Sequence, residues 1–544
     1  MKLRWAFTGI IILSFTAFCF AQPFSKWQTK RHFNEARRMI LFSNYKDAIP
    51  PLEYLLKKDS SNANFNYLLG MCYLHIPLKK ENALPYLIMA AKSVNEKYTE
   101  LDFKEKNAST KTYFLLGQAY HVGYKFDIAE NYFAKYLGYL PVNSDEYKET
   151  KRYMEICQNA PKLINDSIEI SIESLGPVIN SEWDEHSPTL TSDENTLIFT
   201  SRRKGSTGGL LTDDGRYFED IYISHKENGK WSEPVGISSN INTDMHEASI
   251  CISPDGQELY IYKDDYGIGN IYLSTKDSLN NWAKPVKLGP QVCTSANETD
   301  ATISADKNTL IFVSDRSGGF GGKDLYVSYR LPNGEWSIAK NLGNTINTPY
   351  DEVGPFLLPD GYTLYFSSKG HNTLGGYDLF YSELQEDGTW SVPKNLGYPV
   401  NTTEDDAFYV LSADEKRAYF SSIRDDSYGG KDLYVMNLLS LPERSSAVIK
   451  GKVFMQGNDT VPVTNVSISV KDNKTGKLMG QYKPNKTTGY YVMILRQGRE
   501  YTITCENEDC IFEPKIVNVP MNTSLYEMEK PLILDPLGKI KKKE

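Results

Sequence analysis

The chain has 544 residues, 40% of them hydrophobic and 24% charged, which is enough for three or four globular domains that each bury a core. Its formal net charge is −9, and its one basic run, at positions 539–543, lies at the extreme end. An acidic chain has no broad positive field that attracts nucleic acid, so we expect no nucleic-acid binding and interpret residues 536–544 as a solvated basic tail.

The segment 1–21 has the pattern of a secretory signal peptide. Lys2 and Arg4 form a positive start, and an apolar run over positions 5–20 leads to a small-residue cleavage site that ends at Ala21. The apolar run is short for a membrane span, so an uncleaved anchor is the weaker alternative. Lipid attachment at Cys19 is not expected, because a phenylalanine precedes this cysteine. We therefore expect cleavage after Ala21 and export of the mature chain.

The segment 26–160 is predicted to form helical repeats. Small and large residues recur with the same spacing in two places: Ala36, Ala48 and Leu52, then Gly117, Ala129 and Phe133. The step from Ala36 to Gly70 equals the period of the tetratricopeptide repeat, and the region resembles three such repeats with an insertion near 96–109 and a capping helix after Ser144. Such arrays offer a groove to a partner, so the resemblance implies that a protein binds there, with a purely structural spacer as the alternative.

From position 168 the pattern changes to short strands and glycine-rich turns in five similar units. An aspartate marks the turn between the first two strands of each unit: Asp193, Asp255, Asp306, Asp360 and Asp414. These aspartates recur at nearly equal intervals, and a third strand follows in each unit, with a tryptophan-bearing fourth strand in the first four. Four strands in each such unit are typical of a β-propeller, and the copies resemble the WD40-like repeats of periplasmic propeller proteins such as TolB.

The fifth unit ends without a fourth strand of its own, because positions 437–439 run into a linker. The segment 167–176 alternates β-favouring residues and leads into a stretch like those that follow the tryptophan strands. We therefore predict that this early strand completes the last blade, which removes an open sheet edge. The result is a propeller over residues 164–440 with five blades, six blades being the alternative.

Each unit also carries a pair of polar residues just before its first strand. The second member of every pair is a carboxylate: Glu185, Glu247, Glu298, Glu352 and Asp406. Because the first strand of a blade is innermost, we expect these five side chains to gather around one mouth of the channel. A ring of carboxylates there could hold a cation or a basic peptide, but we favour the alternative that each one accepts hydrogen bonds from a neighbouring blade's turn.

The segment 446–535 is predicted to form a small β-sandwich. Positions 466–470 alternate β-favouring residues and a turn follows at 473–476, so the unit resembles the carboxypeptidase-regulatory-like domain. Cys505 and Cys510 are expected to form one local disulfide, because no second cysteine pair or histidine completes a zinc site. We expect no metal and no cofactor.

The fold class is therefore a helical solenoid followed by all-β domains. This order of domains resembles envelope proteins of Bacteroidetes-type bacteria, some of which are associated with gliding motility and type IX secretion. The resemblance implies a periplasmic or outer-membrane-associated scaffold, peripheral to the membrane at most, that binds envelope proteins through its helical groove. A propeller that recognises peptidoglycan, another soluble glycan or a peptide is the alternative. Such proteins commonly continue into an OmpA-like domain, which the sequence up to Glu544 does not contain, so direct cell-wall anchoring is not expected.

The motifs of several enzyme classes are absent from the sequence. We find no Gly-x-Ser-x-Gly nucleophile elbow, no P-loop, no Rossmann fingerprint and no His-x-x-x-His pair. We therefore expect no catalysis. A hydrolase that uses the carboxylates of the propeller, as glycosidases do, is the weaker alternative.

Overall fold

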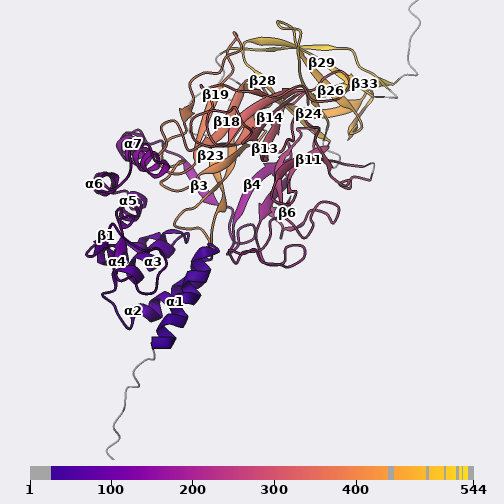
Figure 1. Cartoon of the computed structure of the whole chain (residues 1–544). Helices are drawn as coiled ribbons and strands as arrows, with labels where there is room; N and C mark the ends of the chain where they lie inside the picture. The colour runs from indigo at the N-terminus through magenta and orange to yellow at the C-terminus, as the bar shows by residue number, and fades with distance from the viewer. Residues whose placement is uncertain are drawn as a thin grey trace, which may run out of the picture.

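The computed structural model describes residues 26–536, apart from 278, 414, 439–445, 485–488, 508–509, 522–525 and 530. The predicted signal peptide, the tail from position 537 onward and the turn residue Asp414 lie outside the described residues. In the described part, a helical region, a series of small sheets and a C-terminal group of strands follow one another along the chain (Figure 1). No helix within these ranges is both long and apolar enough to cross a membrane.

The helical region is built from helices that pack in sequence-adjacent pairs. Its elements are α1 (Lys26–Leu41), α2 (Tyr45–Leu56), α3 (Ala63–Leu74), η1 (Lys80–Asn82), α4 (Ala83–Ala90), α5 (Thr112–Val122), α6 (Phe126–Leu137) and α7 (Asp145–Asn165). Helix α1 packs on α2, α3 on α4, α5 on α6 and α6 on α7. A β-carbon at Gly117 would lie 2.4 Å from the Phe133 ring, and one at Gly70 would lie 2.6 Å from Leu87. The small residues at these two positions therefore allow the paired helices to approach closely.

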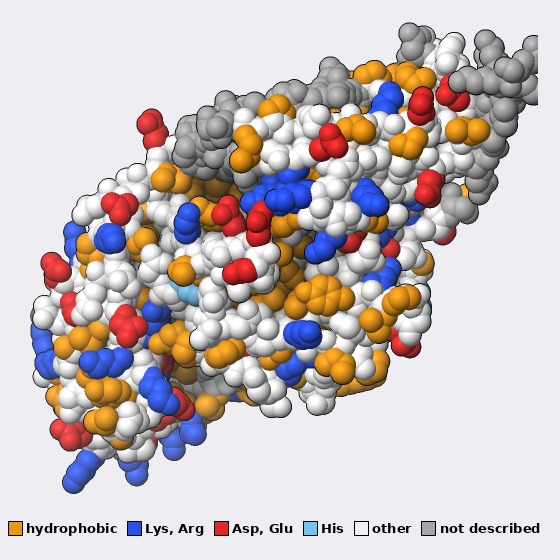
Figure 2. Space-filling model, turned by 90° about the horizontal axis from the view of Figure 1, so that it is seen from above, with side chains coloured by type: hydrophobic (Ala, Val, Ile, Leu, Met, Phe, Trp, Pro, Cys, Tyr) orange, Lys and Arg blue, Asp and Glu red, His pale blue; other side chains and the backbone are white. Residues whose placement is uncertain are grey.

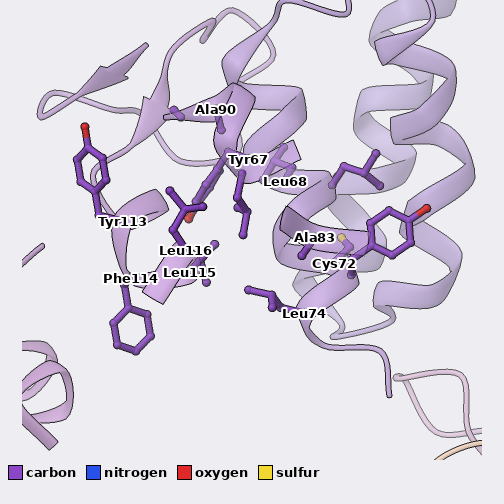
Figure 3. Packing of buried hydrophobic residues seen from close by; sticks show 14 of the residues in the cluster. Tyr67, Leu68, Cys72, Leu74, Ala83, Ala90, Tyr113, Phe114, Leu115 and Leu116 are labelled. Carbon is purple, nitrogen blue, oxygen red and sulfur yellow. The ribbon is translucent and has the colours of Figure 1, made fainter. Parts of the chain in front are cut away.

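The core of the helical region lies between α3 and α5. Both helices bury side chains on nearly every face, and Figure 3 shows Tyr67 and Leu68 of α3 beside Leu115 and Leu116 of α5. A helix that is apolar on all sides is stable only when neighbouring elements cover it. This requirement explains why α3 and α5 occupy the middle of the array and why Cys72 is completely buried.

The insertion between α4 and α5 folds back onto the array. It contains the short parallel pair β1 (Val94–Asn95) and β2 (Ala108–Ser109). The Phe103 ring meets the edge of Phe33 in α1 at a centroid distance of 5.6 Å, and the Tyr98 hydroxyl donates to Asn64 Oδ1 in α3 at 2.8 Å. The chain itself therefore covers part of the surface of α1 and α3.

In the part of the chain that the structure describes, five sheets follow the helical region, and each has at least four strands. The first contains β4 (Glu185–Leu190), β5 (Thr196–Ser201), β6 (Asp220–Glu227), β7 (Lys230–Trp231) and β8 (Val235–Gly236); the second β9 (Glu247–Ile252), β10 (Glu258–Asp264), β11 (Gly269–Thr275) and β12 (Val286–Lys287); the third β13 (Glu298–Ile303), β14 (Thr309–Ser314), β15 (Asp324–Tyr329) and β16 (Lys340–Asn341); the fourth β17 (Glu352–Leu357), β18 (Thr363–Ser368), β19 (Asp378–Glu383) and β20 (Lys394–Asn395); the fifth β21 (Ala407–Leu411), β22 (Arg417–Ser422), β23 (Asp432–Asn437) and β3 (Ser171–Ser174). All pairings within these sheets are antiparallel.

The first strands of the five sheets face one another. Strand β4 contacts β9, β9 contacts β13, β13 contacts β17, β17 contacts β21, and β21 contacts β4 again. Apolar side chains such as Phe312 and Phe366 are completely buried between neighbouring sheets. This is the arrangement of a propeller-type β-domain, in which each sheet is stable only because its two neighbours cover its faces.

The strand that closes the fifth sheet comes from the N-terminal side, as predicted. Strand β3 pairs antiparallel with β23, with Ser171 opposite Asn437 and Ser174 opposite Tyr434. The Leu175 amide and the Asn180 side-chain amide both donate to the Leu433 carbonyl at 3.0 Å. These bonds satisfy the edge of β23, which an open sheet would leave free to pair with another chain.

The C-terminal group of strands forms two sheets around one core. Its strands are β24 (Ser446–Met455), β25 (Asn458–Pro462), β26 (Ser467–Asp472), β27 (Leu478–Tyr482), β28 (Tyr490–Arg496), β29 (Arg499–Glu506), β30 (Cys510–Ile511), β31 (Lys515–Val519), β32 (Tyr526–Glu529) and β33 (Leu532–Pro536). Strand β24 is the centre of one sheet, and β26 and β29 form the centre of the other. The predicted disulfide is wrong, since no disulfide bond joins Cys505 and Cys510 in the structure. The Cys510 thiol instead points at Met455 Sδ, 3.3 Å away.

Both ends of the propeller-type domain are covered by other parts of the chain. The helical region lies against the loops that join second to third strands, where His121 in α5 bonds to the Leu374 carbonyl. The C-terminal strands lie against the turns at the opposite end, where the Gln481 amide donates to the Ala305 carbonyl at 3.0 Å and Arg496 stacks over Tyr362. Figure 1 shows the sheets between these two regions.

Candidate functional site

The five carboxylates selected from the sequence are completely buried. Each has an exposed fraction of 0%: Glu185, Glu247, Glu298, Glu352 and Asp406. Glu298 is typical of the set. Its side chain accepts hydrogen bonds from the Thr294 amide and hydroxyl at 2.9 Å each, from the Ser314 hydroxyl at 2.8 Å and from the Arg316 guanidinium at 3.0 Å.

The same contacts recur around the ring. A Ser or Thr one turn earlier in the chain donates both its amide and its hydroxyl to the carboxylate in every unit. In the second unit Lys263 replaces the serine of the second strand and donates to Glu247 at 2.8 Å. The hypothesis of a ligand-binding ring at an open mouth is therefore wrong, and the favoured alternative is corrected in its partners, because these donors belong to the carboxylate's own unit and not to a neighbouring blade's turn. The five carboxylates fix the start of the first strand of each sheet, and their hydrogen-bond donors leave no room for a ligand.

Burial changes the acidity of several of these groups. It raises the pKa of Glu185, raises that of Glu352 to about 7 and raises that of Asp406 to about 6, because a charged carboxylate loses hydration that its donors replace only in part. The third-strand Asp324 adds repulsion at Glu352. Burial and the neighbouring Asp406 likewise raise the pKa of Asp378 to about 8. Carboxyl groups of the first and third strands thus meet in the interior.

The first member of each pair, and not the second, lies at the mouth. These residues are half-buried: Asp184, His246, Asn297, Asp351 and Asp405. Each accepts a backbone N–H from the loop of the preceding sheet, as when Asp351 accepts from the Lys323 amide at 3.1 Å. Neighbouring residues of a strand point in opposite directions, so a pair at a strand start sends one side chain inward and one to the surface. Sequence reasoning chose the wrong member.

A cavity of about 470 Å³ lies where the helical region meets this mouth. Gln118, His121 and Tyr153 line it from the helices. Eight charged side chains also line it, four cationic and four anionic: Lys80, Arg202, Arg216, Lys431, Asp184, Glu219, Glu404 and Asp405. The cavity therefore lies between two regions that were predicted as separate domains, and no sequence motif marks it.

Most of the charges in this junction cavity are paired. Arg216 bonds to Asp184 at 2.5 Å, Lys431 to Asp405 at 3.1 Å, and Lys80 of the helical region pairs with Glu404 of the sheets. Three histidines line the cavity. Burial lowers the pKa of His75 and of His121 to about 4, so both are neutral at physiological pH.

The third histidine belongs to a cluster around Glu219. His186 Nε2 and His246 Nδ1 lie 3.5 and 3.2 Å from the Glu219 carboxylate. Burial alone would raise the pKa of Glu219, but the two neighbouring imidazoles, His186 and His246, outweigh it and hold that pKa well below its ordinary range. His186 Nδ1 also lies 2.9 Å from the Ser187 hydroxyl. Within the described ranges, no group of three or more His, Cys, Asp and Glu side chains is arranged to hold a metal ion.

The channel itself contains one acid that the sequence analysis missed. Just after each buried carboxylate the first strand offers one position to a narrow cavity of about 90 Å³ that Ile494 of the C-terminal strands caps: Ser187, Ser249, Asp300, Gly354 and Phe408. Asp300 is the only carboxylate of this set. Burial raises its pKa, although Lys323 lowers it in part. An alignment of the five repeats would have revealed Asp300, because it is the one acid at a position that is small or apolar in the other four repeats.

The helical region is fastened to the mouth by a buried arginine. Arg152 in α7 donates from Nη2 to the Lys369 carbonyl at 2.8 Å, to the His371 carbonyl at 3.0 Å and to the Thr373 hydroxyl at 2.8 Å. Its guanidinium also stacks over Tyr350, 4.9 Å from the ring centroid. The two walls of the junction cavity are therefore fixed relative to one another.

No family model and no curated protein matches the chain. Among solved structures it is similar to a TolB-type protein of Agrobacterium tumefaciens, with 14% identity over 60% of this chain and 97% of that one and a TM-score of 0.31. It is also similar to an α-L-arabinofuranosidase of Lactobacillus brevis, with 12% identity over 48% and 92% and a TM-score of 0.35. A family 117 glycoside hydrolase of Zobellia galactanivorans matches with 10% identity over 49% and 90% and a TM-score of 0.32.

Likenesses with 10–14% identity and TM-scores of 0.31–0.35 concern the fold at most. None of these matches supports the expected link to type IX secretion or gliding. The expectation that the chain is not an enzyme is corrected by the matches, because several of them are glycoside hydrolases. The motifs whose absence suggested a non-enzyme belong to other chemistries. Glycoside hydrolysis uses a pair of carboxylates without a local sequence motif, so the missing motifs exclude nothing on such a fold.

Proposed function

We propose that the chain binds a soluble, neutral oligosaccharide in the junction cavity between α3, α5, α7 and the mouth of the propeller-type domain. The observation that carries this proposal is the balance of charge in the cavity wall, with four cationic and four anionic side chains, most of them paired. Its volume of about 470 Å³ lies in the range of small-ligand sites.

The chemistry of the wall suits sugar hydroxyls. Each hydroxyl both donates and accepts, and ion pairs offer carboxylate acceptors beside guanidinium or ammonium donors without a net field. A strongly charged ligand would gain little from a balanced wall and would lose its own hydration. On the face shown in Figure 2, positive and negative side chains are likewise interspersed. A neutral glycan is therefore favoured over an acidic or basic peptide.

The cavity proposal is tested with two substitutions in its wall. Arg216→Gln and Lys80→Gln each remove one charge-assisted donor, and we expect neutral oligosaccharides to bind about tenfold more weakly, which corresponds to ~1.4 kcal/mol. Isothermal titration calorimetry with a panel of neutral and charged oligosaccharides measures this. Lys474→Gln is the matched control, since Lys474 makes an exposed ion pair with Glu386 at the C-terminal strands. Equal affinity in all variants, or a preference for charged ligands that salt weakens, would contradict the proposal.

We further infer the type of each of the three regions from its packing. The helix pairs with Gly70 and Gly117 at their contacts support three tetratricopeptide-type units, and the closed order of five first strands supports a five-bladed propeller. The C-terminal pair of sheets around one core supports a carboxypeptidase-regulatory-like sandwich. The insertion over α1 and α3 leaves less of the helical groove for a protein partner, which favours ligand binding at the junction over binding in the groove.

The proposed location is the periplasm or the periplasmic side of the outer membrane, where a scaffold role with envelope proteins would also take place. The support is the signal-peptide pattern of the segment 1–21. N-terminal sequencing of the protein from its own cells is expected to begin at Gln22 or its cyclised form. A chain with an intact Met1 in the cytosolic fraction would exclude export.

A further inference from the structure

The loops that join the second and third strands carry an apolar residue at one equivalent position. It precedes the aspartate or asparagine at the start of the third strand by the same spacing, and in sheets two to five it is Tyr266, Phe320, Leu374 and Tyr428. All these loops lie at the end of the sheets that faces the helical region. Repeats of one structural unit place equivalent residues at equivalent points around the axis, so what one of them does shows what the others are able to do.

One of the four is already used in a contact between domains. Leu374 is completely buried and belongs to the apolar core of the helical region. Around it, His121 Nε2 bonds to the Leu374 carbonyl at 2.9 Å, and Arg152 binds the loop just before it. The loop of the fourth sheet thus inserts Leu374 into the surface of the helical region.

The equivalent residues on the second, third and fifth sheets remain exposed. Tyr266 on the second sheet has an exposed fraction of 99%, and Phe320 on the third has 51%. Three further apolar side chains in the loops of sheets one and two are exposed as well: Leu210, Leu211 and Ile268. We call these five residues the exposed rim. Loops on a rigid scaffold carry a disproportionate share of binding residues, and tyrosine is one of the residue types enriched at the centre of protein interfaces.

We propose that the exposed rim is the docking surface of a second protein, which presents a helical surface to Tyr266 and Phe320 as α5 and α7 present one to Leu374. The third sheet is the direct neighbour of the fourth, so the rim continues an interface that the chain already forms with helices. Apolar surface in contact with water is unfavourable in free energy, and a contiguous exposed apolar patch marks an interaction site. This proposal is independent of the glycan in the junction cavity.

The test places a photo-reactive p-benzoylphenylalanine at position 266 or 320 of the full chain in the cells that produce it. Positions 338 and 392 are the controls, because Ile338 and Val392 have exposed fractions of 75% and 76% but lie beside the outer strands β16 and β20. After irradiation we expect one and the same protein to be cross-linked from 266 and from 320, and not from the controls. Mass spectrometry of the cross-linked peptide is expected to place the contact in an apolar surface of helices.

A second variant separates docking from misfolding. Phe320→Ser combined with the cross-linker at 266 is expected to reduce the adduct roughly fivefold, the effect of ~1 kcal/mol at an interface centre, while the unfolding temperature stays unchanged because Phe320 is half exposed. Absence of an adduct at 266 and 320 would overturn the proposal. So would an adduct of equal yield at the controls, an adduct with a second copy of this chain, or one with lipid or glycan alone.

Discussion

Arg152→Ala is expected to detach the helical region from the propeller-type domain and to weaken ligand binding in the junction cavity about 100-fold, which corresponds to ~2.7 kcal/mol. The buried guanidinium donates to two carbonyls and one hydroxyl of the 369–373 loop and stacks on Tyr350. Removal leaves those acceptors buried without a donor, which costs about 1–3 kcal/mol for each group. One wall of the cavity then moves away from the other.

Calorimetry measures the detachment without any ligand. The wild-type helical and sheet regions are expected to unfold together, whereas Arg152→Ala is expected to show a separate transition of the helical region at lower temperature. Arg37→Ala, on the exposed side of α1, is the control and should leave a single transition. A single, unshifted transition in Arg152→Ala would mean that the other contacts, such as His121 with Leu374, are sufficient.

The propeller-type domain is expected to be more stable at pH 5.5 than at pH 8.5. Burial and neighbouring carboxyls raise the pKa of Asp378 to about 8, of Glu352 and Asp432 to about 7, and of Asp406 to about 6. A group whose pKa is higher in the folded state contributes stability that is present below its unfolded pKa, near 4, and is lost as the pH rises through the folded pKa. The loss therefore extends from about pH 4 to about pH 8.

Glu352→Gln separates this effect from other titrations. The Glu352 carboxylate accepts from the Thr348 amide at 2.9 Å and from the hydroxyls of Thr348 and Ser368 at 2.6 and 2.7 Å. A glutamine carbonyl keeps the first bond, and its NH₂ group donates to the two hydroxyls. We expect ~2 kcal/mol of added stability at pH 8.5 and almost none near pH 4, measured by denaturant unfolding at both values.

Asp387→Asn is the control for the pH experiment, because the Asp387 carboxylate is fully exposed in the turn between the third and fourth strands of the fourth sheet. It should not change the pH profile of the propeller-type domain. An unfolding temperature that rises from pH 5.5 to pH 8.5, or a Glu352→Gln variant with the wild-type profile, would show that the buried carboxyls stay ionised at all these values.

The sequence by itself determined the local units and their order. Helix pairs followed from small residues at fixed intervals, the repeated strands followed from the turn aspartates, and the closing strand Ser171–Ser174 followed from a missing fourth strand. Each of these features belongs to a short unit that recurs along the chain, so the periodicity of the sequence records it.

Only the tertiary structure decided what those units do together. In the fold, Glu298 and its equivalents are buried while their neighbours lie at the mouth. Asp300 faces the channel. Arg152, which a helical sequence pattern predicts to be a surface charge, is buried. The fold also placed Leu374 in the helical core while Phe320, at the equivalent position, stayed exposed. Burial depends on which distant segment covers a residue, and a local pattern contains no information about a segment that lies in another domain of the chain.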